Sequence, residues 1–360
     1  MHVKTLIASY LIAIIGGVIF NWIQFPIPWI LGSITSMLIY KVMLKKNTYS
    51  SPRLKNISLA ILGIQIGQTF TPDTLHTVQP YFIPYMIFSI LMIIIAILNG
   101  YWITKWVSID PVTSILGTIP GGLSTSIALS DSLKGNTIMV TIFHTIRLLA
   151  VLFIIPLAVL HWFNSPEGNV ISDLSKHQVH ETPWILILYF TSICLGFLLQ
   201  KKVPASLIVI PMILTAIFQI TNLGTFSFPS EVFLFAQLTL GVFLGNSVKI
   251  RDLLKAGKYC GIYLGLNLFL IVITIIFAWL FSLWTGIPMA VAVLSIAPGG
   301  LVEMALTAQS VGLNPSIVSS LQIIRLLIVV LIIPIALQVT FKMIKKKEPV
   351  HQKEDYNHHD

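Results

Sequence analysis

Residues 119–123 read Ile-Pro-Gly-Gly-Leu, and residues 297–301 read Ala-Pro-Gly-Gly-Leu, 178 positions further along the chain. The same offset places Asn136 on Asn314 and Arg147 on Arg325 without a gap, and 17 of the 44 positions in 116–159 recur in 294–337. An apolar composition inflates chance matches among Leu, Ile and Val, but it does not align Pro, Gly, Asn and Arg. The chain is therefore a tandem duplication.

The composition around these motifs is that of a membrane protein. Of the 360 residues 56% are apolar and 10% are charged, whereas a soluble domain has about 25% charged residues. Two cysteines provide no disulfide framework and no CxxC metal site. Twelve hydrophobic segments are long enough to be considered as membrane segments: 5–22, 27–44, 55–70, 80–104, 111–133, 137–160, 184–200, 203–221, 230–247, 259–284, 287–311 and 315–341.

The sequence predicts four regions. Residues 1–160 and 184–341 are the two membrane repeats, 161–183 is a polar linker, and 342–360 is a polar tail. The first apolar segment has no small-residue cleavage site, so we interpret it as a retained span and not as a signal peptide.

The distribution of Lys and Arg over the loops distinguishes a parallel from an inverted arrangement of the repeats, because cytoplasmic loops carry the excess of positive charge. If all twelve segments cross, 13 of these residues lie inside and 7 outside; two arginines lie in the membrane. If the Pro-Gly-Gly segments enter and return on the same side, 19 lie inside and 1 outside. The second count predicts an all-α polytopic protein of two inverted repeats, each with five spans and a re-entrant or broken helix. Both termini are then cytoplasmic, and the linker is extracytoplasmic.

Each Pro-Gly-Gly segment predicts a helix break at membrane depth, because Pro removes a donor and Gly permits dihedrals that other residues avoid. Freed backbone groups are tolerated there only when they are buried in protein or line a watery cavity. Paired breaks in inverted repeats indicate a transporter's binding site near the midplane. The alternative is a pair of kinked structural helices. The residues concerned are Pro120, Gly121, Gly122, Pro298, Gly299 and Gly300, with Ser124 and Thr125 following the first break.

Arg147 and Arg325 are the charges that most need an explanation. Each follows an asparagine, Asn136 or Asn314, by 11 residues. Asparagine is well suited to cap a helix, and 11 residues of helix rise about 16 Å, roughly half of the hydrocarbon core. We therefore expect both guanidinium groups near the midplane. One interpretation is that one or both guanidinium groups bind an anionic group of the substrate. The other is that they form structural hydrogen bonds with carbonyls of the broken segments or with a carboxylate.

Glu303 follows the second break, and its counterpart in the first repeat is Thr125. A buried carboxyl group on one side only predicts a coupling site for a proton or for sodium. The alternative is a fixed ion pair with Arg325 or Arg147. His144 and its counterpart Gln322 lie one turn before the arginines, and we expect them to line the same cavity, although a lone intramembrane histidine is more often a satisfied hydrogen-bonding residue.

Pairs of glycines four residues apart predict close approach between helices. They are Gly63 and Gly67, Gly241 and Gly245, and the series Gly257, Gly261 and Gly265.

The duplicated Pro-Gly-Gly-Leu segments are each followed by an Asn and by an Ile-Arg-Leu-Leu helix that ends in Pro, over 118–156 and 297–334. In these residues the chain resembles the AbrB family of bacterial membrane proteins, over nearly all of both repeats. The family has been labelled ammonia monooxygenase and regulator of gene expression, and it is similar to the cation/proton antiporter and anion transporter superfamily. The resemblance implies inverted repeats with discontinuous elements and a bacterial cell-membrane location, and it supplies no substrate.

The sequence favours a secondary transporter that moves a small anionic organic solute by alternating access, coupled to a proton or sodium ion. A monooxygenase would need clustered His or carboxylate ligands, and His144 is the only histidine within a predicted span. We therefore predict no enzyme activity, no metal and no cofactor. A membrane sensor or regulator is the alternative, although no nucleic-acid-binding motif is present. The predicted partners are the lipid bilayer and the solute, with homodimer formation left open.

Overall fold

The computed structural model describes residues 2–45, 48–120, 123–163, 184–221, 226 and 228–330. Within these residues every regular element is a helix, as the composition predicts. Most of the linker 161–183 and the whole tail 342–360 lie outside the described residues.

The first repeat begins with α1 (His2–Trp22), α2 (Pro28–Leu44), α3 (Pro52–Gly67), α4 (Pro72–Val78) and the 3-10 turn η1 (Gln79–Tyr81). It continues with α5 (Phe82–Ile103), α6 (Pro111–Thr118), α7 (Leu123–Ser132) and α8 (Thr137–Trp162). The second repeat contains α10 (Ile185–Leu198), α11 (Ser206–Ile220), α12 (Ser230–Ser247), α13 (Ile250–Ala256) and α14 (Lys258–Thr285). It ends in α15 (Met289–Ile296), α16 (Leu301–Ser310) and a final helix described over Pro315–Val330.

The helix boundaries repeat at the offset seen in the sequence. Each of α2, α3, α4, α6, α7 and α8 has a counterpart that begins 178 residues later, in α11, α12, α13, α15, α16 and the final helix. Four helices of the first repeat begin with proline, whose fixed φ suits the first helical position. The short helices α4 and α13 were not among the predicted segments, yet they too form such a pair.

Several helices are long and apolar enough to cross a membrane. Among the described residues they are α1, the continuous stretch Pro72–Ile103, α8 and α14. A fifth candidate is α12 with α13, which bend by 42° at the junction between them. Shorter apolar helices are α2, α10, α11 and the final helix.

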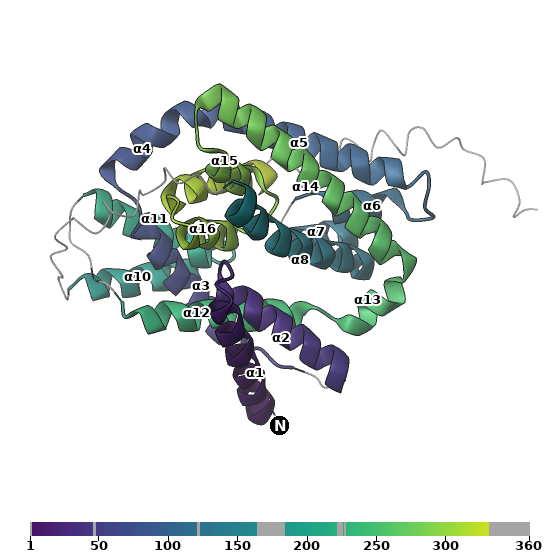
Figure 1. The fold of residues 1–360 in the computed structure, drawn as a ribbon, viewed down its shortest axis with the longest axis horizontal. Helices are drawn as coiled ribbons and strands as arrows, with labels where there is room; N and C mark the ends of the chain where they lie inside the picture. The colour runs from purple at the N-terminus through teal and green to yellow at the C-terminus, as the bar shows by residue number, and fades with distance from the viewer. Residues whose placement is uncertain are drawn as a thin grey trace, which may run out of the picture.

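The helices gather into two bundles (Figure 1). The first bundle contains α1, α2, α3, α10, α11 and α12, with a core of Ile, Leu and Met side chains contributed by α2, α3, α11 and α12. The second bundle contains α5 to α8, α14 to α16 and the final helix. α5 and α14 lie side by side along the edge of the molecule opposite α1 and α2 (Figure 1). The two bundles are joined by the contact between α3 and α16 and by apolar side chains of α8 and α16 that pack into the same core, namely Leu152, Leu301, Val302, Ala305 and Leu306.

The close helix approach predicted from the glycine pairs is confirmed for two of the three sets. Gly63 and Gly67 in α3 lie against the backbone of α11, and Gly241 and Gly245 in α12 lie against α2. The series Gly257, Gly261 and Gly265 is different, because no atom of the described chain lies within 4 Å of a Cβ built at any of them. The prediction of close helix packing is therefore wrong for this series within the described chain. Gly257, with φ of 52°, instead supplies the turn between α13 and α14.

Candidate functional site

Each repeat contains a broken helical segment that we name by order. The first broken segment is α6 and α7, interrupted between Thr118 and Leu123, and the second is α15 and α16, interrupted between Ile296 and Leu301. An eight-residue helix such as α6 or α15 is about 12 Å long, less than half the thickness of a hydrocarbon core. Neither can cross a membrane alone, and the last carbonyl groups of each need partners other than a further helical turn.

Arg325 supplies partners for the second break. Its guanidinium donates to the carbonyls of Ile296 and Ala297, and to that of Gly299 at 2.7 Å. It also donates to Oε1 of Gln322, one turn earlier on the final helix. A guanidinium has five N–H donors, so most of the hydrogen-bonding capacity of Arg325 goes to this segment.

Gln322 completes the contact with the end of α15. Its side-chain amide donates to the carbonyl of Leu294 at 2.8 Å and to that of Ser295 at 3.1 Å, while its oxygen accepts from Arg325. The side chain is 1% exposed. Gln322 therefore links the arginine to the last turn of α15.

The first repeat builds the same arrangement from a different side chain. Arg147 donates to the carbonyl of Ile119, and its second terminal nitrogen lies 2.8 Å from Nδ1 of His144. Nε2 of His144 lies 3.0 Å from the carbonyl oxygen of Leu116. Ile119 and Leu116 are the counterparts of Ala297 and Leu294, so the contacts repeat at the offset of 178.

These contacts assign the protonation state of His144. Arginine can only donate, so Nδ1 must accept, and a carbonyl can only accept, so Nε2 must carry the hydrogen. The imidazole is therefore neutral in its Nε2–H form. In this form it offers one acceptor towards the arginine and one donor towards a carbonyl, as the amide of Gln322 does.

A tyrosine from the opposite repeat also reaches each broken segment. Tyr85 in α5 donates to the carbonyl of Ser295 in α15 at 2.9 Å. Its counterpart Tyr263 in α14 donates to Oγ of Ser114 in α6 at 2.7 Å, and that hydroxyl in turn donates to the carbonyl of Gly100. Both tyrosine side chains are completely buried. Each repeat thus contributes to holding the other's break.

Glu303 lies in the first turn of α16, directly after the second break. Its side chain is 6% exposed. The carboxyl group folds back over Gly300, where a Cβ would overlap it. A carboxylate in the first turn of a helix interacts favourably with the helix dipole. The structure thus places Glu303 at the second break, and the choice between a coupling site and an ion pair with an arginine stays a prediction.

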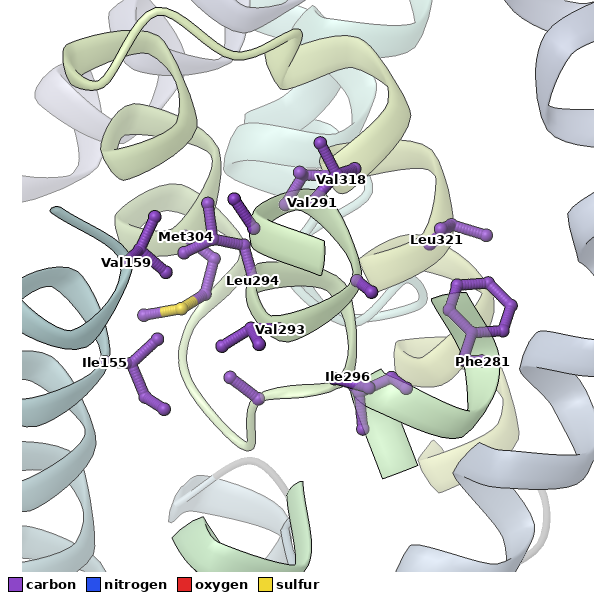
Figure 2. Packing of buried hydrophobic residues seen from close by; sticks show 14 of the residues in the cluster. Ile155, Val159, Phe281, Val291, Val293, Leu294, Ile296, Met304, Val318 and Leu321 are labelled. Atoms are coloured by element: carbon purple, nitrogen blue, oxygen red, sulfur yellow. The ribbon is translucent and has the colours of Figure 1, made fainter. Parts of the chain in front are cut away.

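Apolar packing holds the second broken segment against α8. Figure 2 shows the Met304 side chain pointing from α16 towards Ile155 and Val159 of α8, with Val293 and Leu294 of α15 beside it. These side chains are fully or almost fully buried. The polar contacts at the break are therefore flanked by a dry core, in which electrostatic interactions are stronger than in water.

The two arginines are each bound to the break of their own repeat. Arg147 is 7% exposed and Arg325 is partly buried. The predicted caps are also confirmed, since the side-chain oxygens of Asn136 and Asn314 accept from Met139 N and Ser316 N in the first turns of the two helices.

Other predicted residues are placed only in part. Gly121 and Gly122 lie outside the described residues, as do the side chains of Ser124 and Thr125. Pro120 and Pro298 lie within the two breaks, and the Cβ position of Gly299 faces the Met304 side chain. In the part of the chain that the structure describes, no three His, Cys, Asp or Glu side chains form a group that could hold a metal ion.

A family model described as "Transition state regulatory protein AbrB" matches residues 29–340, which cover both repeats and both broken segments. The chain belongs to the AbrB family. "Uncharacterized protein YhjN" of Bacillus subtilis (strain 168) is 27% identical to it over 343 residues, covering 89% of this chain and 88% of the relative. "Putative regulator AbrB" of Escherichia coli (strain K12) is 24% identical over 311 residues, covering 84% and 86%.

Sequence reasoning missed two site residues of this AbrB-family protein. Tyr85 and Tyr263 are ordinary aromatic residues in apolar helices, and nothing local distinguishes them from core side chains. Their positions differ by 178, so the self-comparison that found the arginines also contained this pair. The signal was a polar aromatic residue at equivalent places in both repeats.

Proposed function

We propose that this AbrB-family protein is a secondary transporter that carries a small organic anion across the bacterial cell membrane by alternating access. The observation that carries the proposal is the pair of arginines in the second bundle, one bound to each broken segment. A charge inside a membrane protein is costly and marks a functional site by default. Two positive charges at equivalent breaks would both be stabilised by an anion bound between them.

The hydrogen bonds of the arginines shape this proposal. In the present conformation Arg325 gives most of its N–H donors to backbone carbonyls. It would therefore attract an anion mainly by its positive charge, because few donors are left to form hydrogen bonds with the anion. An incoming anion would attract both guanidinium groups and weaken their hold on the breaks. Substrate binding would thereby be coupled to a change in the broken segments, which is the differential contact that a population shift requires.

The reciprocal contacts between repeats support the inverted arrangement. Tyr85 reaches from the first repeat to the second break, and Tyr263 reaches from the second repeat to the first break. Such reciprocal contacts fit a two-fold relationship between the repeats, whether the axis lies in the membrane plane or along its normal. The count of 19 positive residues inside against 1 outside favours an axis in the membrane plane, as in other inverted-repeat carriers.

We propose that the two bundles are the parts that move. The first bundle packs around close glycine contacts between α3 and α11 and between α2 and α12, which suits a rigid body. The second bundle carries both breaks. Gln65 of α3 donates to Gln309 of α16 at 3.1 Å, beside apolar packing between α16 and the first bundle, so a movement of the bundles would change both the polar and the apolar contacts.

Glu303 is the proposed coupling residue. It is a buried carboxyl group in the first turn of α16, next to the second break, where it could take up a proton or bind sodium. Its counterpart Thr125 cannot change charge, so the coupling step would operate at one break only.

Thermal stability of the purified protein in detergent tests the proposal. The wild type is compared with the Arg147→Gln/Arg325→Gln variant against organic anions, amino acids and cations at two pH values, with Arg251→Gln in exposed helix α13 as the matched control. We expect one class of anion to stabilise the wild type and the control but not the double variant. Counterflow of the same anion in proteoliposomes then separates transport from binding. If neither protein responds to any anion, the reading changes to a cation antiporter or a membrane regulator.

A further inference from the structure

The two broken segments are held by equivalent contacts from α8 and from the final helix, but only in the contacts to the first segment is the side chain beside the arginine one that can take up a proton. His144 and Gln322 occupy the same place in the two repeats, and each joins its arginine to the last turn of the preceding short helix. Gln322 makes its contacts in the only charge state that it has. His144 makes its contacts only as neutral imidazole with the hydrogen on Nε2.

Protonation would remove the acceptor that Arg147 uses. Imidazolium carries hydrogens on both nitrogens, so an N–H would point at a guanidinium nitrogen that also donates, across the present 2.8 Å. Two positive charges would also stand side by side. The contact between Nε2 and the Leu116 carbonyl survives protonation, because that nitrogen donates in both states. The proton therefore breaks one specific contact, the one between His144 and Arg147.

The surroundings of His144 offer little to compensate for a second charge. α6, which accepts its hydrogen bond, has no titratable side chain, and neither does α15. In the described part of the chain no carboxylate is hydrogen-bonded to the imidazole, and Arg147 is the neighbour whose charge acts on it. The titratable or charged groups on the other elements packed against α8, and on the final helix, are Lys258, Tyr259, Cys260 and Tyr263 on α14, Asp131 on α7, Arg251, Asp252 and Lys255 on α13, Glu303 on α16, and Arg325.

We propose that His144 and Arg147 form a proton-operated clip on the first broken segment, while Gln322 and Arg325 form a clip on the second segment that no proton opens. When His144 takes up a proton from the aqueous side to which the site is open, Arg147 moves away from it, and the guanidinium loses the fixed orientation that holds the Ile119 carbonyl. The end of α6 is then released, while the end of α15 stays bound. The use of the His144–Arg147 clip in transport rests on the proposed function, because the clip adds a second titratable group to the proposed transport site. The structural step itself needs no substrate.

Hydrogen–deuterium exchange of the full-length protein in detergent tests the clip. The reporters are the amides of Ile119 and Ala297, which close the last turns of α6 and α15 by donating to Ile115 and Val293. After correction for chemical exchange, we expect the peptide covering 111–120 to exchange about tenfold faster at pH 5 than at pH 8, the scale of one lost charge-assisted hydrogen bond. The peptide covering 289–298 should show no such change.

The two repeats provide reciprocal variants. His144→Gln copies the second clip into the first segment, and it should abolish the pH response of 111–120 without loss of protection at pH 8. Gln322→His copies the first clip into the second segment, and it should give 289–298 the pH response. A pH response of 111–120 that persists in His144→Gln, or one absent from the wild type, would overturn the proposal.

A second measurement reads the protonation state of His144 in the wild type. In protein labelled with ¹⁵N-histidine, the nitrogen shifts of His144 at pH 8 should be those of neutral imidazole protonated at Nε2, with assignment by comparison with His144→Gln. Protonation at Nδ1, or imidazolium at pH 8, would contradict the clip. Neither experiment requires transport, so a failure of the proposed carrier function would leave both readouts intact.

Discussion

Gly63 in α3 lies so close to Ile208 in α11 that a Cβ atom at residue 63 would fall 2.5 Å from the Ile208 carbonyl oxygen. The reverse contact is also present, because Gly241 lies against Ile30, and these two are the counterparts of Gly63 and Ile208 at the offset of 178. The first bundle is thus joined by two equivalent contacts in which a glycine of one repeat receives the backbone of the other.

Gly63→Ala should therefore destabilise the protein. The obstructing atom is backbone, which cannot rotate away, so we expect a loss of about 1–3 kcal/mol, typical of an overpacked interior. Gly261→Ala is the matched control, since it lies in α14 with no atom of the described chain within 4 Å of its Cβ position. It should be neutral or slightly stabilising because alanine favours a helix. Thermal unfolding in detergent measures both. Equal effects of the two substitutions would contradict the close contact.

The glycine beside Glu303 offers a test of the second break. A Cβ at residue 300 would overlap the Glu303 carboxyl group, so Gly300→Ala should cost about 1–3 kcal/mol in the wild type. The cost should fall by at least about 1 kcal/mol in a Glu303→Ala background, because residues in contact are not additive. Gly299→Ala is the control, since its new methyl group meets the flexible Met304 side chain and should show no coupling to Glu303. Additive effects of Gly300→Ala and Glu303→Ala would mean that the carboxyl group lies elsewhere.

The sequence predicted the broken segments and the positions of both arginines for a definite physical reason. Pro, Gly, Asn and Arg are rare within apolar helices, so their ungapped recurrence carried information that the surrounding Leu and Ile could not. Capping by Asn136 followed from the preference of asparagine for that position, and the structure confirms it. The expected depth of the arginines in the membrane rests on helix rise alone and stays a prediction.

Side-chain partners could not be predicted in the same way. Arg147 and Arg325 were open to an anion, to carbonyls or to a carboxylate, and only the folded geometry shows that each donates to backbone carbonyls of its break. The contacts of Tyr85 and Tyr263 join distant helices of different repeats, and no local pattern encodes such contacts. The short helix α13 escaped detection because seven residues with three charges lack an apolar run.

The charge and the geometry of Arg325 can be separated by two substitutions. Arg325→Lys keeps the positive charge but replaces the planar fork by a single ammonium group, so the contacts of one terminal nitrogen with Ala297 and of the other with Gly299 and Gln322 cannot all be made. We expect Arg325→Lys and Arg325→Gln to lower stability similarly, by about 2 kcal/mol or more. Stabilisation by an anion should survive in Arg325→Lys and be lost in Arg325→Gln. Loss in both variants would show that the site needs the fork and not the charge alone.

Lys41 provides a prediction outside the second bundle. Its ammonium group donates to three carbonyls at the end of α12, those of Gly245, Asn246 and Val248, at 2.8–2.9 Å. A cation there also interacts favourably with the helix dipole. Lys41→Met should cost about 1–3 kcal/mol because these carbonyls lose their partner. Lys45→Met, at an exposed position after α2, should be within about 0.5 kcal/mol of the wild type in thermal unfolding.

The inverted arrangement makes the sharpest topological prediction. In a chain whose Cys194 and Cys260 are replaced by serine, single cysteines at Ser172, Lys201 and Lys255 are labelled in intact cells with a membrane-impermeant maleimide. The inverted arrangement places residue 172 outside and residues 201 and 255 inside, and the parallel arrangement places each on the opposite side. We expect labelling at 172 alone, with 201 and 255 labelled only after the cells are opened. Lys45→Cys is cytoplasmic in both arrangements and controls for intact membranes. Labelling of 201 and 255 from outside, with 172 protected, would show that the broken segments cross the membrane and that the repeats are parallel.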